Sequence, residues 1–151
     1  MDALQEGVGV SLTTPIGLTT VRFSSVAGIP IARVLVVDDE PQIVAVLGEL
    51  LAELGYATRC AMTGPEALRL VGEFQPDVVL LDLALPEMRG EAVLEQLYHS
   101  SPHLPVIMVT GNDDPDVARR TLAQGAFDYI AKPFTLGRLQ QVLEAALTYR
   151  D

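Results

Sequence analysis

Short runs of consecutive apolar residues recur along the chain, and each is followed by a polar loop and then by an amphipathic stretch. Strong runs cover residues 34–37, 78–81 and 106–109, and weaker ones cover 56–61 and 128–131. An apolar run of this length without polar alternation is typical of a parallel strand that is buried on both faces. The pattern therefore predicts five strands, and the two weaker ones are expected at the edges of the sheet.

The segments between these runs carry apolar residues at intervals of three and four, which is the spacing of one helix face. Pro41 begins the first helix and Gly55 ends it, Thr63 and Glu66 form a capping box at the second, and Thr135 caps the last. The residues expected to face the core are Ile43, Val46, Leu47, Leu50, Leu51 and Leu54 in the first helix, Leu68, Val71 and Phe74 in the second, Val93, Leu94 and Leu97 in the third, Val117, Thr121 and Leu122 in the fourth, and Leu136, Leu139, Leu143, Ala146 and Leu147 in the fifth.

Alternation of strand and helix with short loops predicts an α/β protein with a doubly wound parallel sheet, right-handed crossovers and helices on both faces. With the second and fifth strands at the edges, the strand order is 2-1-3-4-5. Ligands of such sheets bind outside the carboxyl ends of the strands, at the switch point between the first and third strands. Residues 31–151 are expected to form this domain, and residues 1–30, which are rich in Gly, Thr and Ser, a poorly ordered extension.

Polar side chains follow the strands at that edge. Asp38 and Asp39 come after the first strand, Asp82 after the third, Thr110 ends the fourth, and Lys132 follows the fifth. Carboxylates that lie this close repel one another, and a hard cation such as Mg²⁺ removes the repulsion while it holds phosphoryl oxygens. The sequence therefore predicts a site for a divalent metal and a phosphoryl group.

Lys132 is the only lysine in a chain that has nine arginines. A compact ammonium at a strand end can reach a carboxylate or a phosphoryl oxygen. The first strand is followed by acidic residues and Pro41, and not by a glycine-rich loop. A nucleotide or flavin phosphate would meet carboxylates there instead of backbone amides, so those ligands are disfavoured.

Composition narrows the class of protein further. The net charge is −10, and only Asp2, Glu6 and Arg22 are charged before residue 31, so the acidic excess belongs to the domain and disfavours direct binding of nucleic acid. The single cysteine, Cys60, excludes an internal disulfide and is expected to be a small buried apolar residue. No apolar run could span a membrane and the start does not resemble a signal peptide, so a cytoplasmic location is expected.

The sequence features that carry a resemblance to a known family are these strand ends, the loop at residues 85–90, and Thr110, Tyr129 and Lys132 with their neighbours. Together they resemble the receiver (response regulator) domain of two-component signal transduction systems. The resemblance covers residues 33–150 and implies a flavodoxin-like (βα)5 fold. It implies a signalling phosphoprotein, not a turnover enzyme. Such a domain accepts a phosphoryl group from the phosphohistidine of a histidine kinase or histidine phosphotransfer protein, and it assists its own phosphorylation and autodephosphorylation.

The resemblance assigns roles to the acidic residues. Asp82 would be the phosphoacceptor, whose carboxylate forms the aspartyl phosphate. Asp39, Asp82 and the backbone carbonyl of Ala84 would bind Mg²⁺, or Mn²⁺ as a substitute, and Asp38 would help directly or through water. Ala84 and Asn112 stand where the family tunes the lifetime of the phosphoryl group, so that lifetime is left open.

The resemblance also assigns the residues of the switch. Thr110, Gly111 and Lys132 would bind the phosphoryl oxygens, and Tyr129 would turn inward as Thr110 moves toward the phosphoryl group. The peptide bond between Lys132 and Pro133 would be cis. The surface of the fourth helix, fifth strand and fifth helix would then change, and it would bind a downstream effector protein or a second copy of the domain.

Two other functions compete with this interpretation. Phosphatases of the haloacid-dehalogenase type also use an aspartate at a strand end as the nucleophile, but they need a second aspartate two residues later, where this chain has Ala84. The other alternative is a receiver-like interaction module that is never phosphorylated, and Asp82, Thr110 and Lys132 argue against it. The kinase, the downstream target and whether the chain stands alone are not predicted. We also expect that the chain ends at Asp151 and that no effector domain follows the fifth helix.

Overall fold

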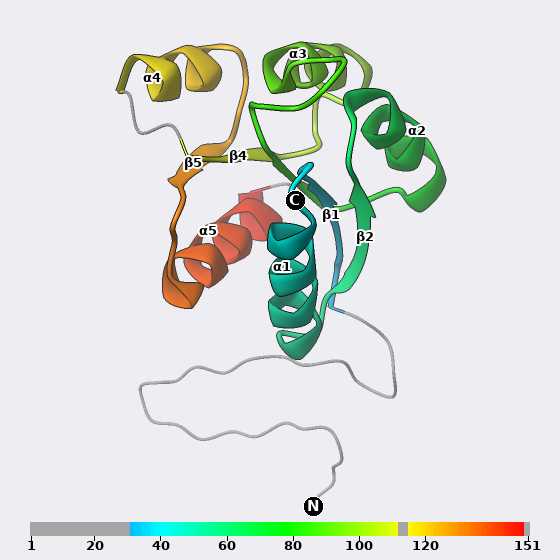
Figure 1. Cartoon of the computed structure of the whole chain (residues 1–151), viewed down its shortest axis with the longest axis vertical. Coiled ribbons are helices and arrows are strands. Elements are labelled where there is room, and N and C mark those ends of the chain that lie inside the picture. The colour runs from blue at the N-terminus through cyan, green and yellow to red at the C-terminus, as the bar shows by residue number, and fades with distance from the viewer. Residues whose placement is uncertain (1–30, 112–114, 150–151) are drawn as a thin grey trace, which may run out of the picture.

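The structure, a computed structural model, describes residues 31–111 and 115–149 of the chain. Strands and helices alternate without exception in this part of the chain (Figure 1). The elements are β1 (Arg33–Val37), α1 (Pro41–Glu53), β2 (Ala57–Ala61), α2 (Gly64–Phe74), β3 (Val78–Leu81), α3 (Gly90–Ser100), β4 (Val106–Thr110), α4 (Pro115–Ala123), β5 (Asp128–Ala131) and α5 (Leu136–Tyr149). The predicted extension at residues 1–30 and Asn112 lie outside the described residues.

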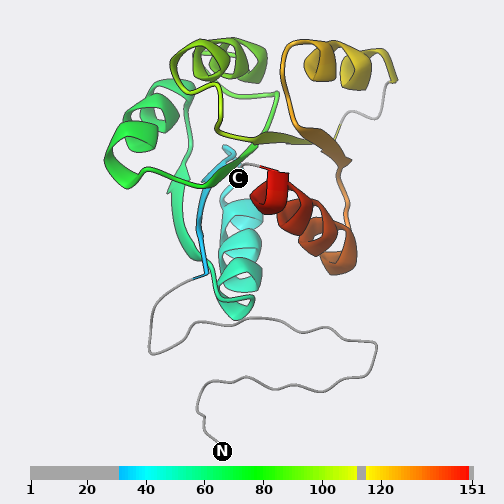
Figure 2. The same ribbon diagram turned by 180° about the vertical axis from the view of Figure 1, so that it is seen from behind.

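The strands form one parallel sheet in the order β2-β1-β3-β4-β5, which confirms the predicted fold class and strand order. Helices α1 and α5 cover one face, and α2, α3 and α4 cover the other, as Figure 1 and the view from behind in Figure 2 show. The strand ends that carry the predicted site are therefore held between two helical layers. None of the described helices has both the length and the apolar character that crossing a membrane requires.

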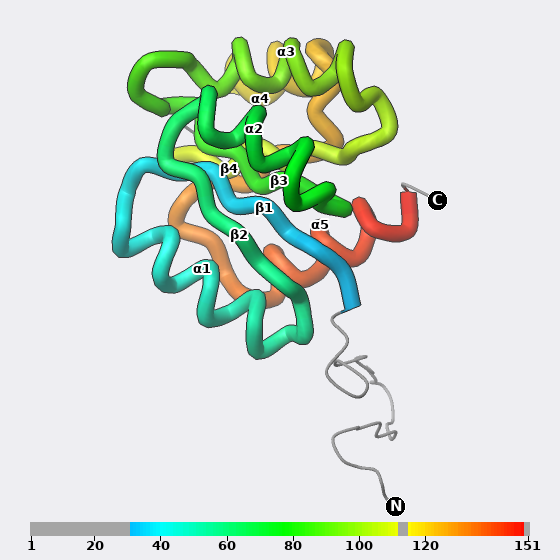
Figure 3. Tube along the Cα trace, turned by 90° about the vertical axis from the view of Figure 1, so that its right-hand side faces the viewer, coloured from blue at the N-terminus to red at the C-terminus, as the bar shows by residue number. Residues whose placement is uncertain are grey.

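Each face of the sheet has its own apolar core. Alternate residues of β1 and β3 point to opposite layers, so Leu35 and Val79 pack under α2 and α3, whereas Val36 and Leu80 pack against α1 and α5. The tube in Figure 3 shows the strands lying between the two helical layers. Burial on both faces explains why these strands are continuously apolar in sequence.

The helix ends follow the predicted signals. Thr63 accepts a hydrogen bond from the Glu66 amide at 3.2 Å, while the Glu66 carboxylate accepts one from the Met62 amide, one residue before the cap. Thr135 accepts a hydrogen bond from the Arg138 amide at 3.0 Å. Gly55, which follows α1, has a φ of 95°, a conformation that favours glycine over other residues.

Three residues that were predicted to face the core are exposed instead: Val46 in α1, Leu122 in α4 and Leu136 in α5. The residues buried most deeply in α2 are Ala67 and Leu70, whereas Leu68, Val71 and Phe74 are only partly buried. The physical reason is that a helix resting on a flat sheet buries a narrower stripe than the full set of apolar positions at intervals of three and four. The predicted stripes of α1, α4 and α5 were therefore too wide, whereas the predicted stripe of α2 was displaced by one residue from the buried one.

Candidate functional site

Two aspartates leave the sheet side by side. Strands β1 and β3 pair with Val37 opposite Leu81, and the Asp82 amide donates to the Val37 carbonyl at 2.9 Å, so the strand pairing continues to Asp82. Asp38 and Asp82 are buried, with 2% and 5% of their surface exposed, while Asp39 is exposed. One carboxylate oxygen from each of the three aspartates lies within 4.8 Å of the others.

The loop after β3 is folded back on the strand end by a close approach of Gly90. The Gly90 amide donates to the Leu83 carbonyl at 2.9 Å, and a Cβ atom at Gly90 would lie 2.3 Å from the Asp82 carbonyl oxygen. Only glycine allows α3 to begin this close to the phosphoacceptor candidate. The same loop brings the Ala84 amide to 3.3 Å from Asp82 Oδ1, which helps to orient the carboxylate.

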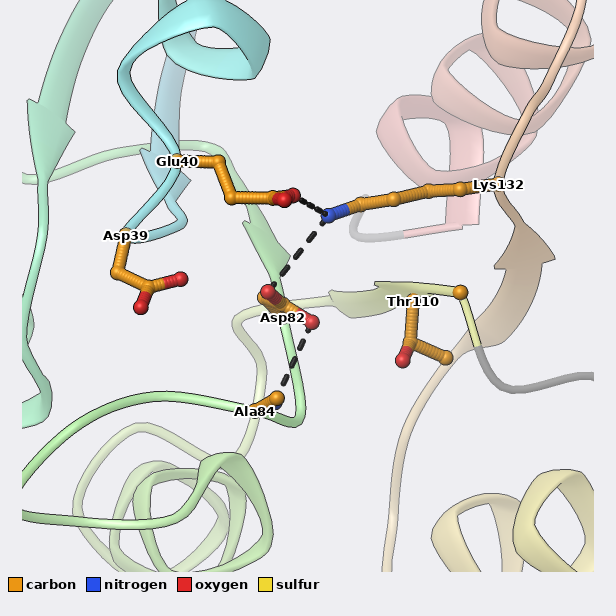
Figure 4. Close-up of a pocket in the computed structure, with 7 residues that line it drawn as sticks. Asp39, Glu40, Asp82, Ala84, Thr110 and Lys132 are labelled. Carbon is orange, nitrogen blue, oxygen red and sulfur yellow. Dashed lines mark hydrogen bonds and ion pairs between the residues drawn. The ribbon is translucent and has the colours of Figure 1, made fainter.

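Lys132 extends from the end of β5 across the edge of the sheet. Its backbone amide donates to the Thr110 carbonyl at 2.8 Å, and the peptide bond that joins it to Pro133 is cis. Its ammonium Nζ lies 2.7 Å from Asp38 Oδ2 and 3.6 Å from Asp82 Oδ2. Figure 4 shows the Lys132 side chain extending across the site toward Glu40, with its ammonium above Asp82.

The charges at this edge shift two pKa values. Burial and the charge of Asp38 raise the pKa of the Asp82 carboxyl, although Lys132 and the Ala84 amide act in the opposite direction. Burial alone would lower the pKa of Lys132, but the hydrogen bond to Asp38 and the charge of Asp82 raise it overall. Ionisation of Asp82 is therefore less favourable than in water, and Lys132 is held in its charged form.

These groups surround a cavity of about 570 Å³ (Figure 4). Carboxylate and carbonyl oxygens are the donors that Mg²⁺ prefers, and a cavity of this size has room for the waters that the ion keeps. The aspartate cluster could hold such an ion, which would also offset the charge that Lys132 leaves uncompensated. The residues that line the cavity are Asp39, Glu40, Asp82, Ala84, Thr110, Gly111 and Lys132.

Tyr129, the predicted switch residue, does not line this cavity. Its ring packs against the core beneath α2, α3 and α4, and its phenol oxygen is buried. Its backbone carbonyl accepts a hydrogen bond from the Arg138 guanidinium at 3.3 Å, which ties β5 to α5. The structure therefore brings the metal and phosphoryl candidates together and places the ring of Tyr129 in the neighbouring core.

Glu40 is the cavity residue to which the sequence assigned no role. Its carboxylate Oε1 lies 3.2 Å from Lys132 Nζ, and half of its side-chain surface is exposed. A signal was present in the sequence, because Glu40 is the third acidic residue in a row after β1 and directly precedes Pro41. Position alone did not show whether its side chain points toward the cavity or toward solvent.

Comparisons with known proteins agree with the resemblance to receiver domains that the sequence shows. The family model of the response regulator receiver domain matches residues 34–144. The chain is 39% identical over 117 residues to the regulatory protein AtoC of Escherichia coli K12, and 39% identical over 116 residues to the DNA-binding transcriptional regulator NtrC of the same strain. These matches cover 78% and 77% of this chain but 25% of each relative, so the chain spans about a quarter of their length.

Solved structures match over most of the described domain. The crystal structure of the receiver domain of NtrX from Brucella abortus has a TM-score of 0.73 and 36% identity, and the match covers 76% of this chain and 98% of that one. A response regulator receiver domain protein from Clostridium thermocellum has a TM-score of 0.74 and 33% identity, with coverage of 78% and 95%. Both matches extend over nearly the whole of the solved domain.

Proposed function

The chain belongs to the family of response regulator receiver domains, and from this premise we propose that Asp82 accepts a phosphoryl group from a phosphohistidine. The observation that carries the proposal is the position of Asp82. Its carboxylate opens into the cavity, lies 3.6 Å from the Lys132 ammonium, and belongs to a cluster of three aspartates. A buried nucleophile, a cation and a candidate metal site thus meet at one strand end.

In the proposed reaction, a carboxylate oxygen of Asp82 attacks the phosphorus atom while the phosphorus–nitrogen bond to the histidine breaks. The electron pair of that bond stays on the imidazole of the partner, which takes up a proton from solvent. A bound Mg²⁺ supplies charge neutralisation for the phosphoryl oxygens. Asp38, Asp39, Asp82 and the Ala84 carbonyl would hold Mg²⁺, or Mn²⁺ in its place.

The proposed phosphoryl contacts come from the neighbouring ends of β4 and β5. Thr110 lies at the cavity wall with Gly111 next in the chain, and Lys132 extends into the cavity from the same side. An ammonium and a hydroxyl at these positions would bind the oxygens of the aspartyl phosphate. Movement of Thr110 toward the phosphoryl group would change the packing of Tyr129 and thereby the surface formed by α4, β5 and α5.

We propose a histidine kinase or histidine phosphotransfer protein as the donor, and an effector protein or a second copy of the domain as the partner of the α4, β5 and α5 surface. We also propose that the domain acts in the cytoplasm. The net charge of the chain, −10, disfavours direct contact with nucleic acid. The DNA binding that the name of NtrC records belongs to that protein.

A turnover phosphatase is the weaker candidate. A second aspartate would have to stand two residues after the nucleophile to act as acid and base, and the cavity carries the methyl group of Ala84 at that position. Repeated hydrolysis of added phosphomonoesters would favour the phosphatase. Retention of about one hydroxylamine-labile phosphoryl group per chain would favour the receiver, since acyl phosphates react with hydroxylamine.

The substitution Asp82→Asn tests the proposal directly. We expect it to abolish labelling by radioactive acetyl phosphate in the presence of Mg²⁺, because the amide is not a nucleophile that can form an acyl phosphate. Asp77→Asn is the matched control: Asp77 lies at the opposite end of β3, where its carboxylate accepts a hydrogen bond from the Arg33 amide. The control should label like the wild type, and labelling that persists in Asp82→Asn would contradict the assignment.

A further inference from the structure

Three carboxylates share the ammonium of Lys132. Asp38, Glu40 and Asp82 lie 2.7, 3.2 and 3.6 Å from its Nζ atom. In Figure 4 the Glu40 side chain reaches across the cavity and meets Lys132 from the side of β1, while Asp82 lies below both. The ammonium that is proposed to bind the phosphoryl group is therefore already engaged on the side of the loop between β1 and α1.

We propose that Glu40 is a positioning residue that, together with Asp38, holds the Lys132 ammonium on the β1 side of the cavity until the phosphoryl group arrives. The proposal deepens the phosphoacceptor function proposed above and rests on it. Glu40 would thereby set how readily this receiver is phosphorylated. Its removal would leave Lys132 closer to the geometry of the phosphorylated state.

The local structure explains why Glu40 can take this role. Glu40 occupies the N-cap position of α1 with an extended backbone, φ −97° and ψ 110°, and its side chain makes no capping hydrogen bond. Its amide donates to Asp38 Oδ1 at 2.9 Å, while Asp38 Oδ2 accepts from Lys132. The backbone is thus fixed, and the carboxylate is directed to the cavity instead of the helix terminus.

The contacts of Lys132 with Asp38 and with Glu40 differ in what it costs to break them. Asp38 is buried, so loss of its contact would leave a buried charge without its counter-ion. The Glu40 side chain is 50% exposed and can turn to solvent, which makes its contact with Lys132 a weak one. Of these two contacts, the one with Glu40 is therefore the one that can be released.

A phosphoryl group on Asp82 would make that release necessary. It brings close to two negative charges into the cavity beside the Glu40 carboxylate. Like charges at this distance repel, and both would compete for the same ammonium. We therefore expect Glu40 to turn away as Lys132 moves to the phosphoryl oxygens.

Glu40→Gln keeps the shape of the side chain and removes its charge. We expect this variant to be phosphorylated by acetyl phosphate about two- to fivefold faster than the wild type, the size expected for an exposed ion pair. Glu53→Gln at the far end of α1 is the control, since Glu53 is also exposed and the change in net charge is the same. The control should leave the rate unchanged.

The single lysine offers a readout that a structural role of Glu40 would not move. In protein labelled with ¹⁵N-lysine, the only side-chain ammonium signal is that of Lys132. We expect Glu40→Gln to shift this signal in the unphosphorylated protein. After addition of beryllofluoride, which mimics the phosphoryl group, the signals of wild type and variant should coincide, because Lys132 has then left Glu40.

Glu40→Asp separates the positioning role from helix capping. Aspartate is a favoured N-cap residue, but its shorter side chain should not reach Lys132. We expect this variant to shift the Lys132 signal as Glu40→Gln does. A variant whose signal and labelling rate both match the wild type would overturn the proposal.

The outcomes keep the two proposals apart. Wild-type protein that takes no label would contradict the phosphoacceptor function, while the Lys132 signal of unphosphorylated protein would still decide whether Glu40 holds the ammonium. Normal labelling at Asp82 with equal or slower labelling of Glu40→Gln would overturn the role of Glu40 alone. Faster labelling with a shifted Lys132 signal supports both.

Discussion

The interior of the central strand β3 and the residue that follows its carboxyl end are both buried, but burial affects the stability of the fold in opposite directions at the two places. Leu81 is 0% exposed and the next residue, Asp82, is 5% exposed. Burial of a leucine side chain stabilises the fold by roughly 1.5–3 kcal/mol, whereas burial of a carboxylate is unfavourable unless it is paired. Leu81, the last residue of β3, therefore stabilises the fold, whereas Asp82, the next residue, belongs to the candidate site.

The carboxyl end of the sheet tolerates its charges through a small number of polar contacts. Asp38 and Lys132 pair at 2.7 Å, and the Ala84 amide donates to Asp82. Among the residues that line the cavity, Lys132 is the only cation, and it faces four acidic groups when Asp38 is counted. We therefore expect the strand interior to contribute more to stability than the strand ends, whose acidic side chains depend on the Lys132 ammonium.

The largest effect on stability is expected in the strand interior. Leu80 is fully buried against α1 and α5, so Leu80→Ala should lower the free energy of unfolding by about 3–4 kcal/mol through lost apolar contact and the cavity left behind. Urea unfolding followed by circular dichroism measures the loss. Leu122→Ala in α4 is the control, because Leu122 is exposed and should cost far less. Equal losses in the two variants would contradict the distinction between interior and surface.

A smaller loss is expected when the cation of the site is removed. Lys132→Met keeps the aliphatic chain but leaves the carboxylates of Asp38 and Asp82 without their ammonium, and we expect a loss of about 2–3 kcal/mol in metal-free buffer. Mg²⁺ should recover part of it by supplying positive charge. Arg138→Met is the control, since the ion pair of Arg138 with Asp128 is exposed and weak. A loss no larger than that of the control would mean that Lys132 does not hold the site together.

Sequence alone predicted the strand interiors and most of the strand ends because their signals are local. An apolar run followed by aspartate or lysine defines both the buried strand and the position of the polar side chain, so Asp38, Asp82 and Lys132 could be placed together. Glu40 could not be placed, because the direction of its side chain depends on Lys132, 92 residues later in the chain. Exposure of Leu122 likewise depends on how α4 rests on the sheet.

The smallest and most specific effect is a gain of stability at the strand end. The pKa of Asp82 is raised by burial and by Asp38, which means that its ionised form is disfavoured in the folded protein. Asp82→Asn removes this charge at nearly constant shape. At neutral pH without metal we therefore expect the variant to be more stable than the wild type, by on the order of 1 kcal/mol.

The pH dependence of this gain distinguishes the charge from other effects of the substitution. Well below the ordinary pKa of 3.8, Asp82 is protonated in both the folded and the unfolded chain, so the gain should be small. As pH rises, Asp82 loses its proton in the unfolded chain first, because its pKa is raised in the folded protein. The folded state then binds more protons than the unfolded state, so the stability of the wild type falls relative to that of the variant. This fall ends once the pH has passed the raised pKa of Asp82. Thermal unfolding from acidic to neutral pH measures this difference, and a gain that does not change with pH would contradict the charge argument. Addition of Mg²⁺ should then narrow or reverse the difference, because a bound cation stabilises the wild-type carboxylate more than the asparagine amide.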